Sequence, residues 1–298
     1  MPKPITVVVA GATGKQGGAL ARLLLHRGHQ IRALTRRPGS QAAANLRVLG
    51  AEIFEADLDD GTAVERAAEG ADALFLVGTP YEDGVGAEVR QCRQAAKAAK
   101  EAGVKHLIYS SVASADRSTG IPHFDSKREV ELYIPKLGLP YTIVAPVFFM
   151  ENLLGPMFLE GLRSGTLSMP LPRGRELQMI AVADIAELVR LALERPGEFQ
   201  GKRIDIASDK LTGPEMAKIL AQVTERDVSY AEAPLAAVRA QSEDLARMWA
   251  WFDEVGYSCD LEALRRTYPE VGWHDFSRWA REQDWGVVGA TSPEQPTA

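Results

Sequence analysis

The chain has 298 residues, of which 46% are hydrophobic and 25% are charged, and its net charge is −6 at neutral pH. This acidic balance argues against direct binding to nucleic acid or to an anionic membrane, because both favour a basic protein face. With two cysteines, no convincing metal-ligand spacing and no apolar run near the roughly 20 residues of a membrane span, we expect a cytoplasmic protein without disulfide framework, metal site or membrane anchor.

The first half of the chain alternates apolar runs with helical patterns. Continuous runs rich in Val, Ile and Leu are typical of strands in a parallel sheet that is buried on both faces. Six such runs occur in order: ITVVVAG, QIRALTR, AEIFEAD, DALFLVG, KHLIYSS and YTIVAPV. Helical segments are predicted between them at residues 17–27, 41–49, 61–69, 84–102 and 124–137. Strands that alternate with helices predict an α/β fold, a Rossmann-type doubly wound parallel sheet.

The alternating pattern ends near Pro146. Residues 148–165 are predicted to be helical with a Gly-Pro interruption, and residues 180–196 begin as a strand end and continue as a helix. Residues 202–234 indicate strand, helix and strand, with Thr212 as the N-cap of the helix. The predicted organisation is a Rossmann domain over 1–147 whose sheet is completed by a segment near 177–206, a smaller α+β, mostly helical C-terminal region over 148–285 for a substrate or partner, and a flexible tail over 286–298.

Three glycines three positions apart, Gly11, Gly14 and Gly17, follow the first strand and open the first helix. Their spacing differs from G-x-G-x-x-G, but the strand-to-helix context is the one that a dinucleotide loop needs. Glycine lets the backbone approach a pyrophosphate, whose charge then meets the N–H groups of the helix N-terminus, and Lys15 adds a positive charge. A sharp turn without a ligand is the alternative, but the regular alternation that follows favours a dinucleotide site.

The end of the second strand distinguishes between the dinucleotides. An NAD site usually places an acid about 20 residues after the glycines, on the ribose 2′-hydroxyl. The corresponding stretch here, ALTRRPGS, contains Arg36 and Arg37 and no acid. A guanidinium can bind a 2′-phosphate through paired charged hydrogen bonds, although two solvated arginines are the alternative interpretation. We therefore predict NADP(H) in preference to NAD(H), with Arg36 as the first candidate because adjacent residues rarely both reach one ligand.

Several motifs together resemble a known family. The segments GATGKQGG, TRRP, EADLDD, IYSSVAS, HFDSKREVELYI and PVFFMENLL occur in this order, and SDKLTGPEMAKIL follows in the C-terminal part. The chain thereby resembles the NmrA-like family, atypical members of the short-chain dehydrogenase/reductase superfamily, over nearly its whole length. The resemblance implies a protein that binds a dinucleotide and a regulatory protein partner, often a transcriptional regulator or a signalling enzyme.

The resemblance also implies a set of cofactor contacts. For Asp57, the resemblance implies a contact with the adenine, and the alternative is a role as a charge at the start of the next helix. The implied contacts are Gly11, Thr13, Gly14, Lys15, Gln16 and Gly17 around the pyrophosphate, Arg36 at the 2′-phosphate, Asp57 and Leu58 beside the adenine, and Gly78, Thr79 and Pro80 near the nicotinamide-side ribose.

Active reductases of this superfamily carry a Tyr-x-x-x-Lys pair on one helical face. The tyrosine passes a proton to the substrate carbonyl while the cofactor supplies the hydride. In the matching stretch, HFDSK, Lys127 is present but His123 stands at the tyrosine position. This departure argues against ordinary carbonyl reduction.

Three interpretations of His123 and Lys127 remain open. Lys127 holds the ribose hydroxyls and His123 has no chemical role, or His123 is itself a proton donor, since histidine exchanges protons near neutral pH. In the third, hydride passes to an acceptor that needs little protein acid, such as a quinone. The first fits the resemblance best. It predicts an NADP(H) redox sensor, and the alternative is an NADPH-dependent reductase of quinones or similar small conjugated acceptors.

Phe148, Phe149 and Asn152 follow the sixth strand, where a substrate pocket is expected to open. The aromatic pair is more typical of core packing than of a ligand platform, whereas Asn152 is a polar group that can orient a ligand. The sequence contains no nucleophile elbow and no phosphate-transfer P-loop. It indicates neither the substrate nor the oligomeric state.

Overall fold

The structure, a computed structural model, describes residues 3–289. It divides the chain into two compact units. The first contains the chain up to residue 147 together with residues 182–206 and 262–272, and the second contains the remaining segments. The sequence predicts a first domain over 1–147 whose sheet is completed by a segment near 177–206. In the structure, residues 182–206 supply a helix and an edge strand to the first unit.

The first unit is built on a seven-stranded sheet in the order β10-β6-β5-β4-β1-β2-β3, and every pairing in it is parallel. The strand order reverses between β1 and β4, which is where open α/β sheets bind their ligands. This confirms the predicted Rossmann-type fold. The strands are β1 (Thr6–Val9), β2 (Gln30–Thr35), β3 (Glu52–Glu55), β4 (Ala73–Val77), β5 (His106–Ser110), β6 (Tyr141–Pro146) and β10 (Arg203–Ile206).

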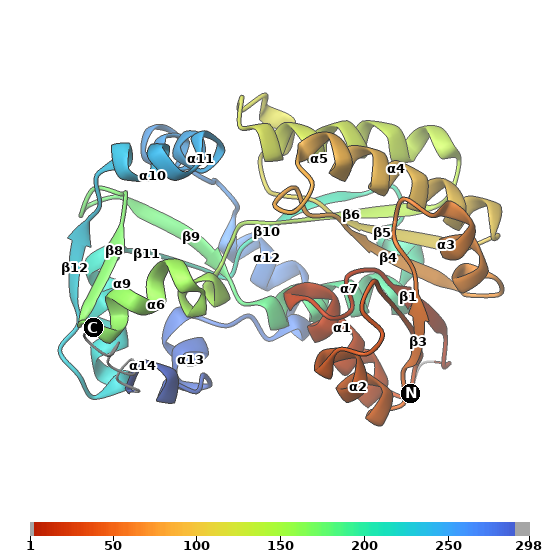
Figure 1. Cartoon of the computed structure of the whole chain (residues 1–298), viewed down its shortest axis with the longest axis horizontal. Helices are drawn as coiled ribbons and strands as arrows, with labels where there is room; N and C mark the ends of the chain where they lie inside the picture. The colour runs from red at the N-terminus through yellow and green to blue at the C-terminus, as the bar shows by residue number, and fades with distance from the viewer. Residues whose placement is uncertain (1–2, 290–298) are drawn as a thin grey trace, which may run out of the picture. The chain divides into compact units, whose positions relative to one another are not determined.

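Helices cover both faces of this sheet. In Figure 1, α3, α4 and α5 lie on one face and α1, α2 and α7 on the other. The expected helix at 124–137 changes after Tyr133 into a 3₁₀ turn, because Pro135 lacks the N–H that an α-helix needs. The helices are α1 (Lys15–His26), α2 (Gln41–Val48), α3 (Gly61–Ala68), α4 (Val85–Glu101), α5 (Pro122–Tyr133), α7 (Val182–Glu194), α8 (Pro196–Phe199) and α12 (Leu261–Thr267), with 3₁₀ turns η1 (Ala115–Arg117), η2 (Ile134–Leu137) and η4 (Pro269–Val271).

A hydrophobic core fills the space between the sheet and the helices α3, α4 and α5. Leu74, Leu76 and Leu107 on the strands are fully buried, and they pack with alanines of α4 such as Ala95 and Ala99. Small side chains on α4 let the helix lie close to the sheet. The side chains of α4 that continue this buried face therefore reach the strand ends, where the candidate site lies.

The second unit carries two small sheets, ordered β11-β9-β7 and β12-β8. The segment near 177–206 was expected to complete the large sheet. Its β10 does so, but β9 pairs antiparallel with β11 and parallel with the short β7 instead. The elements are β7 (Phe148–Phe149), β8 (Thr166–Met169), β9 (Glu176–Ile180), β11 (Asp209–Thr212), β12 (Ser229–Glu232), η3 (Met150–Leu154), α6 (Pro156–Arg163), α9 (Gly213–Thr224), α10 (Leu235–Gln241), α11 (Glu243–Glu254), α13 (Phe276–Arg281) and α14 (Gly286–Gly289).

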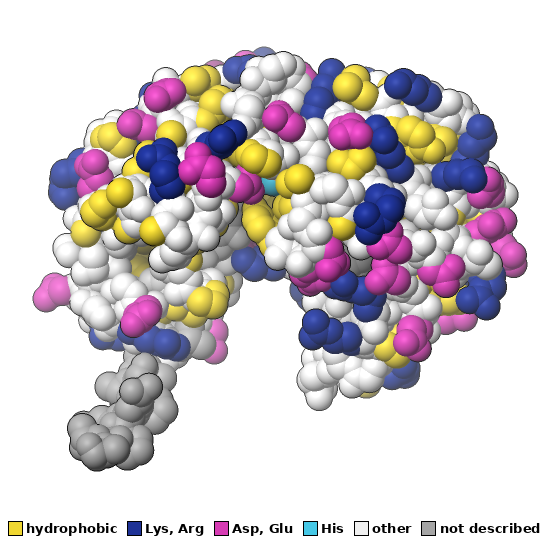
Figure 2. Space-filling model, turned by 45° about the horizontal axis from the view of Figure 1, so that its top comes forward, with side chains coloured by type: hydrophobic (Ala, Val, Ile, Leu, Met, Phe, Trp, Pro, Cys, Tyr) yellow, Lys and Arg dark blue, Asp and Glu magenta, His cyan; other side chains and the backbone are white. Residues whose placement is uncertain are grey.

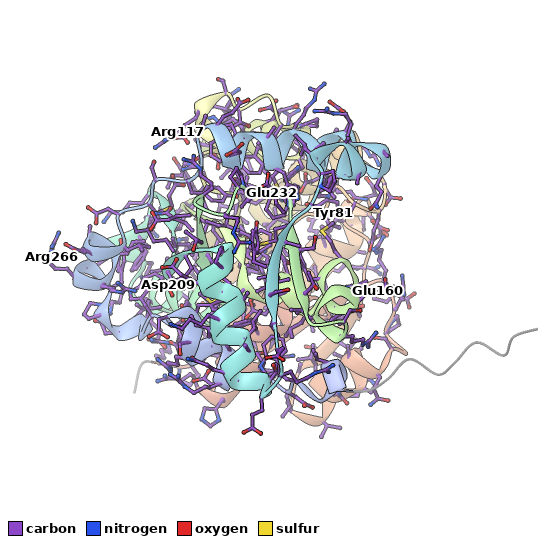
Figure 3. All side chains as sticks on the ribbon, turned by 90° about the vertical axis from the view of Figure 1, so that its left-hand side faces the viewer. Tyr81, Arg117, Glu160, Asp209, Glu232 and Arg266 are labelled. Carbon is purple, nitrogen blue, oxygen red and sulfur yellow. The ribbon has the colours of Figure 1, made fainter. Side chains whose placement is uncertain are left out.

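Local signals in the second unit place α9 as expected. The Thr212 hydroxyl accepts a hydrogen bond from the backbone of Glu215, whose carboxylate accepts one from the backbone of Thr212. Asp209 (Figure 3) accepts a hydrogen bond from the backbone N of Phe276 at 2.7 Å and so ties α13 to β11. Of the expected tail, residues 286–289 form α14, and the remainder lies outside the described residues.

The surface mixes charges of both signs. On the face that Figure 2 shows, Lys and Arg side chains are interspersed with Asp and Glu side chains. Within residues 3–289, no helix combines the length and the apolar character of a bilayer span. The same part of the chain contains no group of three side chains placed to hold a metal ion.

Candidate functional site

The carboxyl ends of the parallel strands gather the predicted cofactor residues at one edge of the first unit's sheet. The glycine loop follows β1, Arg36 follows β2, Asp57 follows β3 and Gly78 follows β4. Because neighbouring parallel strands end at the same edge, segments that are distant in sequence become neighbours there. Ser110 at the end of β5 extends the row, and its hydroxyl lies 2.6 Å from Gln16 Oε1 at the start of α1.

The three glycines of the loop depend on one another sterically. Gly11 has a φ of +62°, and its carbonyl accepts a hydrogen bond from Gly14 N at 2.9 Å, which closes the turn. A Cβ on Gly17 would lie 2.4 Å from the Gly11 oxygen, against backbone that cannot move aside. A side chain at Gly17 would therefore break the turn. The loop brings the backbone as close to the start of α1 as the binding of a pyrophosphate requires.

The N-terminus of α1 is built to face an anion. The N-cap is Gly14, and in the described part of the chain no side chain accepts a hydrogen bond at this cap and no acid lies in the first turn. The first N–H groups of a helix carry partial positive charge. Thr13 and Lys15 are exposed on the loop, and Gln16 and Gly17 are more enclosed. These features fit the diphosphate of a dinucleotide, as the sequence predicts.

Arg36 is already paired with acids. Its guanidinium donates a hydrogen bond to Glu82 and lies 3.9 Å from Asp83, both in the segment after β4. The hydrogen bond to Glu82 raises the pKa of Arg36, so the group stays charged. Its side chain is 44% exposed, and the neighbouring Arg37 is also exposed. A 2′-phosphate on Arg36 would replace or join these carboxylates.

Asp57 and Leu58 lie half-buried after β3. The Asp57 carboxylate accepts a hydrogen bond from Asp59 N at 2.9 Å, while Asp60 caps α3. Asp60 is thus the N-cap of that helix, and the role of Asp57 as a further charge at its start stays an alternative. Asp57 also contributes to the raised pKa of Arg36, so the two side chains lie within electrostatic reach of each other.

Gly78, at the end of β4, allows α4 to approach the strand end. A Cβ at this position would lie 2.5 Å from Cys92 Sγ and 2.9 Å from Glu88 Cγ. Burial raises the pKa of the Cys92 thiol to about 12, which makes it an inert packing group rather than a reactive thiol. Thr79 is exposed and Pro80 is buried in the turn that follows. The absence of a side chain on Gly78 is therefore what lets Glu88 reach this edge of the sheet.

Lys127 and Glu88 form a buried ion pair. Lys127 Nζ lies 2.6 Å from Glu88 Oε1 and 3.3 Å from the Gly78 carbonyl oxygen. The second carboxylate oxygen of Glu88 accepts a hydrogen bond of 2.5 Å from the Ser126 hydroxyl. The Glu88 side chain is fully buried and that of Lys127 is 11% exposed. The structure thus brings Lys127 together with Gly78, as the sequence predicts for the ribose end.

His123 lies one turn before Lys127 on α5 and is 5% exposed. Its ring packs edge-on against Phe124, with centroids 4.9 Å apart, and lies 6.0 Å from the ring of Tyr81. Tyr81, which follows β4, is itself 66% exposed. His123 stands where the resemblance implies the tyrosine of active reductases, and its ring lies against the rings of Phe124 and Tyr81.

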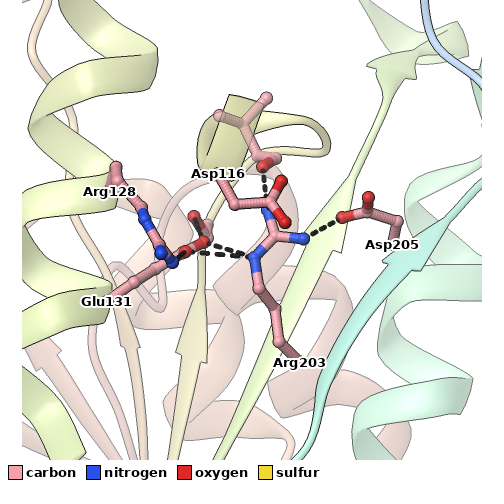
Figure 4. A network of polar contacts seen from close by, with 7 residues as sticks. Asp116, Arg128, Glu131, Arg203 and Asp205 are labelled. Carbon is pink, nitrogen blue, oxygen red and sulfur yellow. Dashed lines mark hydrogen bonds and ion pairs between the residues drawn. The ribbon is translucent and has the colours of Figure 1, made fainter. Parts of the chain in front are cut away.

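A polar cluster, here called the arginine cluster, includes Glu131 of the same helix, α5 (Figure 4). Arg203 Nε lies 3.0 Å from both carboxylate oxygens of Glu131, and Arg203 Nη1 lies 2.5 Å from Asp205. Burial opposes the charge of Arg203, but the carboxylates outweigh it and raise its pKa, whereas burial raises the pKa of Asp205. The cluster joins α5 to β10 and η1; its members are Ser111, Asp116, Arg128, Glu131, Arg203 and Asp205.

The predicted substrate-pocket residues belong to the second unit. Phe148 is buried, and its ring contacts Trp249 at 5.8 Å and Phe158 at 6.3 Å between centroids. This aromatic packing makes Phe148 a core residue of that unit. Phe149 and Asn152 are half-buried, in β7 and η3.

Sequence reasoning missed the residues that surround Lys127, above all Glu88. A signal for it was present. The buried face of α4 runs through Cys92, Ala95 and Ala99, and one turn before Cys92 the same face holds Glu88. An acid at a position where the pattern requires an apolar side chain indicates a buried, paired carboxylate. Its partner was not indicated, because 39 positions separate Glu88 from Lys127.

Comparisons with known proteins agree with this fold. An NAD(P)H azoreductase of Xenophilus azovorans is 31% identical over 225 residues, which cover 75% of this chain and 76% of that protein. An NADPH-dependent quinone oxidoreductase of Escherichia coli, complexed with NADPH, has a TM-score of 0.75 at 25% identity, and the match covers 92% of this chain and 98% of that one.

The transcriptional regulator NmrA has the same fold. Its complex with NADP gives a TM-score of 0.77 at 24% identity and its complex with NAD gives 0.76 at 23% identity, and both matches cover 94% of this chain and 95% of the regulator. The family model described as the NmrA-like family matches residues 3–280. The chain therefore belongs to the NmrA-like family.

Proposed function

We propose that this chain binds NADP(H) and acts as a sensor of its redox state, regulating a partner protein. The observation that carries the proposal is the buried ring of His123, which packs against Phe124 four residues before Lys127. The family resemblance implies a catalytic tyrosine at this position in active reductases. A histidine enclosed in this way has little access to a substrate carbonyl. The pair on α5 is then a binding device rather than a proton-transfer pair.

The residues present fit a dinucleotide phosphate. A Cβ would fill the cradle at Gly17, and the start of α1 presents N–H groups that the described residues leave without a side-chain cap. Arg36 supplies a lasting positive charge beyond the end of β2, where a 2′-phosphate would lie. This charge supports NADP(H) in preference to NAD(H).

When bound, NADPH supplies a hydride and NADP⁺ accepts one. Lys127 would hold the nicotinamide-side ribose hydroxyls, the α1 N-terminus the diphosphate, and Arg36 the 2′-phosphate. The oxidised nicotinamide ring carries a positive charge and the reduced ring does not. A difference of about 1.4 kcal/mol between the two redox forms in their preference for two conformations would change the affinity for a partner tenfold.

The second candidate is an NADPH-dependent reductase of quinones, azo compounds or similar conjugated acceptors. The azoreductase and quinone oxidoreductase among the similar proteins favour it. So does the exposed phenol of Tyr81, whose ring centroid lies 6.0 Å from that of His123. In such a reaction the acceptor gains a hydride and then a proton from water or from one of these side chains.

Calorimetric titration with NADPH, NADP⁺, NADH and NAD⁺ tests the proposal. The Arg36→Ala substitution should weaken NADPH binding about 10- to 100-fold, as expected for a lost charged hydrogen bond, and should leave NADH unchanged. Arg47→Ala, which removes an exposed arginine from α2, is the matched control.

A tenfold or larger difference between NADPH and NADP⁺ supports the sensor. Equal affinities exclude it, because a ligand without differential affinity shifts no equilibrium. NADPH oxidation with a panel of quinones and azo compounds would instead establish the reductase, and its loss in Tyr81→Phe would assign the proton donor.

A further inference from the structure

The buried carboxylate of Glu88 has no role in the function proposed above. Glu88 lies in the first turn of α4, and its side chain is fully buried beneath the end of β4. Burying a carboxylate is costly, and even a well-paired buried ion pair seldom adds stability over an apolar pair of the same size. Packing alone therefore does not account for an acid at this position.

Both oxygens of this carboxylate are held by adjacent residues of α5. Oε1 accepts from Lys127 Nζ at 2.6 Å, and Oε2 accepts from the Ser126 hydroxyl at 2.5 Å. The two contacts fix the plane of the carboxylate and hence the direction from which it meets the ammonium group. Gly78 completes the arrangement, because any side chain there would collide with Glu88 Cγ and Cys92 Sγ.

The ammonium group of Lys127 has three N–H bonds. Within the described residues, its two hydrogen-bond partners are Glu88 Oε1 and the Gly78 carbonyl oxygen, at 2.6 and 3.3 Å. Two directions of the tetrahedral group are thereby fixed, which fixes the third. The flexible four-carbon side chain of Lys127 is thus held with one donor in a set direction before any ligand binds. Ligand binding therefore does not include the entropy cost of ordering this side chain.

We propose that Glu88, with Ser126, is the positioning residue for Lys127, aiming its third N–H at the nicotinamide-side ribose of NADP(H). The inference rests on the proposed function in that it takes NADP(H) as the ligand and the end of β4 as the place of that ribose. It adds that the lysine acts as an oriented hydrogen-bond donor whose charge is already balanced by Glu88.

The test compares two ligands on the full chain by calorimetry. NADPH carries both ends of the dinucleotide, and adenosine 2′,5′-bisphosphate carries the 2′-phosphate end without the nicotinamide-side ribose. Glu88→Ala should weaken NADPH binding about tenfold, which corresponds to one oriented hydrogen bond. It should change the affinity for the bisphosphate less than about twofold. Glu88→Gln keeps an acceptor for Lys127 and should restore part of the NADPH affinity.

Glu131→Gln is the matched control. Glu131 is the other fully buried carboxylate bonded to α5 residues, and it pairs with Arg128 and Arg203 instead of Lys127. This substitution should leave the ratio of the two affinities as in the unchanged chain. In the Lys127→Met background, Glu88→Gln should add no further loss of NADPH affinity, since residues that act through one contact are not additive.

The outcomes separate the two proposals. Absence of NADPH binding by the unchanged chain would overturn the proposed function and this inference together. Weakening by Lys127→Met without weakening by either Glu88 substitution would overturn the inference alone. Equal weakening of both ligands would also overturn it, because Glu88 would then support the fold as a whole. If Glu88→Ala does not fold, the same ratio measured on Glu88→Gln decides.

Discussion

The two ends of the candidate dinucleotide site are built in different ways. The phosphate end consists of backbone and exposed charge: the glycine loop, the start of α1, and Arg36 with a side chain that is 44% exposed. The ribose end consists of buried side chains from separate elements, with Glu88 fully buried and Lys127 only 11% exposed. The phosphate end attracts an anion over a distance and through solvent. The ribose end holds a single hydrogen-bond donor in a fixed direction.

This difference determines what each end can contribute. Exposed charges are screened by salt and change partners easily, so the phosphate end can select NADP(H) but can orient it only loosely. A buried ion pair contributes little net stability, but its geometry is fixed before binding. In our proposal the ribose end is therefore the part of the site on which the position of the nicotinamide depends, and substitutions should separate the two ends.

The largest effect is expected from the arginine cluster, which joins α5 to β10. Arg203→Met would leave Glu131, which is fully buried, and Asp205 without their main cation. We expect the free energy of unfolding to fall by about 3 kcal/mol, the scale measured for breaking one side of a buried ion pair. Urea unfolding of both chains measures this change in the free energy of unfolding.

Arg195→Met is the control for Arg203. Arg195 pairs with Glu270 at 2.8 Å, but both side chains are about 40% exposed, and no measurable change in stability is expected. If the free energy of unfolding of Arg203→Met equals that of the unchanged chain, the arginine cluster does not stabilise the fold.

The amino end of β5, away from both ends of the site, provides a reference for pH. His106 Nε2 lies 2.9 Å from the Thr142 hydroxyl, which donates to the Phe199 carbonyl oxygen, so Nε2 carries a proton and donates it to that hydroxyl. Burial lowers its pKa to about 4 from 6.5. Between these values the unfolded chain binds a proton that the folded chain does not.

The contribution of neutral His106 to the free energy of unfolding is therefore fully present above pH 6.5 and is lost as the pH falls towards 4. The loss at pH 4 is on the order of 3 kcal/mol, and urea unfolding across this range measures it. His106→Gln should flatten the slope between pH 6.5 and 4 while leaving NADPH affinity at neutral pH unchanged. An unaltered slope in that variant would assign the acid sensitivity to another group.

At the phosphate end, Gly17→Ala tests the backbone cradle. The added Cβ would lie 2.4 Å from the Gly11 oxygen, and overpacking of this kind costs about 1–3 kcal/mol of stability. NADPH and adenosine 2′,5′-bisphosphate should both bind about 100-fold more weakly, a loss of about 2.7 kcal/mol, because both carry phosphate at this end. Calorimetry and thermal unfolding measure the two effects.

Gly197→Ala is the matched control, since an added Cβ on that exposed glycine meets nothing within 4 Å. Retained affinity for both ligands in Gly17→Ala, with normal stability, would show that the loop does not carry the diphosphate.

The same contrast explains which parts of the molecule can be predicted from the sequence. The glycine loop and the position of Arg36 depend on local chain geometry, so a short motif in a strand-turn-helix context was sufficient. Glu88 and Lys127 are 39 positions apart and meet only because α4 packs beside α5. One sequence contains no signal for that pairing, apart from an acid on an otherwise apolar helix face.

The fold, too, could be predicted from the sequence only in part. Alternating strand and helix patterns predicted the parallel sheet, because each crossover forces its strands to run in one direction. The strand β9, with the sequence ELQMI, lies in the segment expected to complete the sheet, yet it pairs antiparallel with β11 outside that sheet. Composition indicates that a strand is buried, and the partner of the strand follows only from the packing of the helices around it.

The smallest effect concerns the acids that pair with Arg36. Glu82 bonds to its guanidinium and Asp83 lies 3.9 Å away, so a 2′-phosphate competes with carboxylates already present. These side chains are about half exposed. A pair of this kind contributes at most about 1 kcal/mol, so Glu82→Gln combined with Asp83→Asn should raise NADPH affinity by no more than about fivefold.

NADH affinity should stay unchanged in that variant, because NADH lacks the phosphate that competes for Arg36. Glu69→Gln, which removes one exposed acid after α3 that does not pair with Arg36, controls for the loss of a negative surface charge. Calorimetry at two salt concentrations measures both ligands, and the gain should shrink at the higher concentration as screening weakens the carboxylates. An equal gain for NADH and NADPH would place the effect of the two acids at the diphosphate, and would remove the distinction between a selective phosphate end and an orienting ribose end.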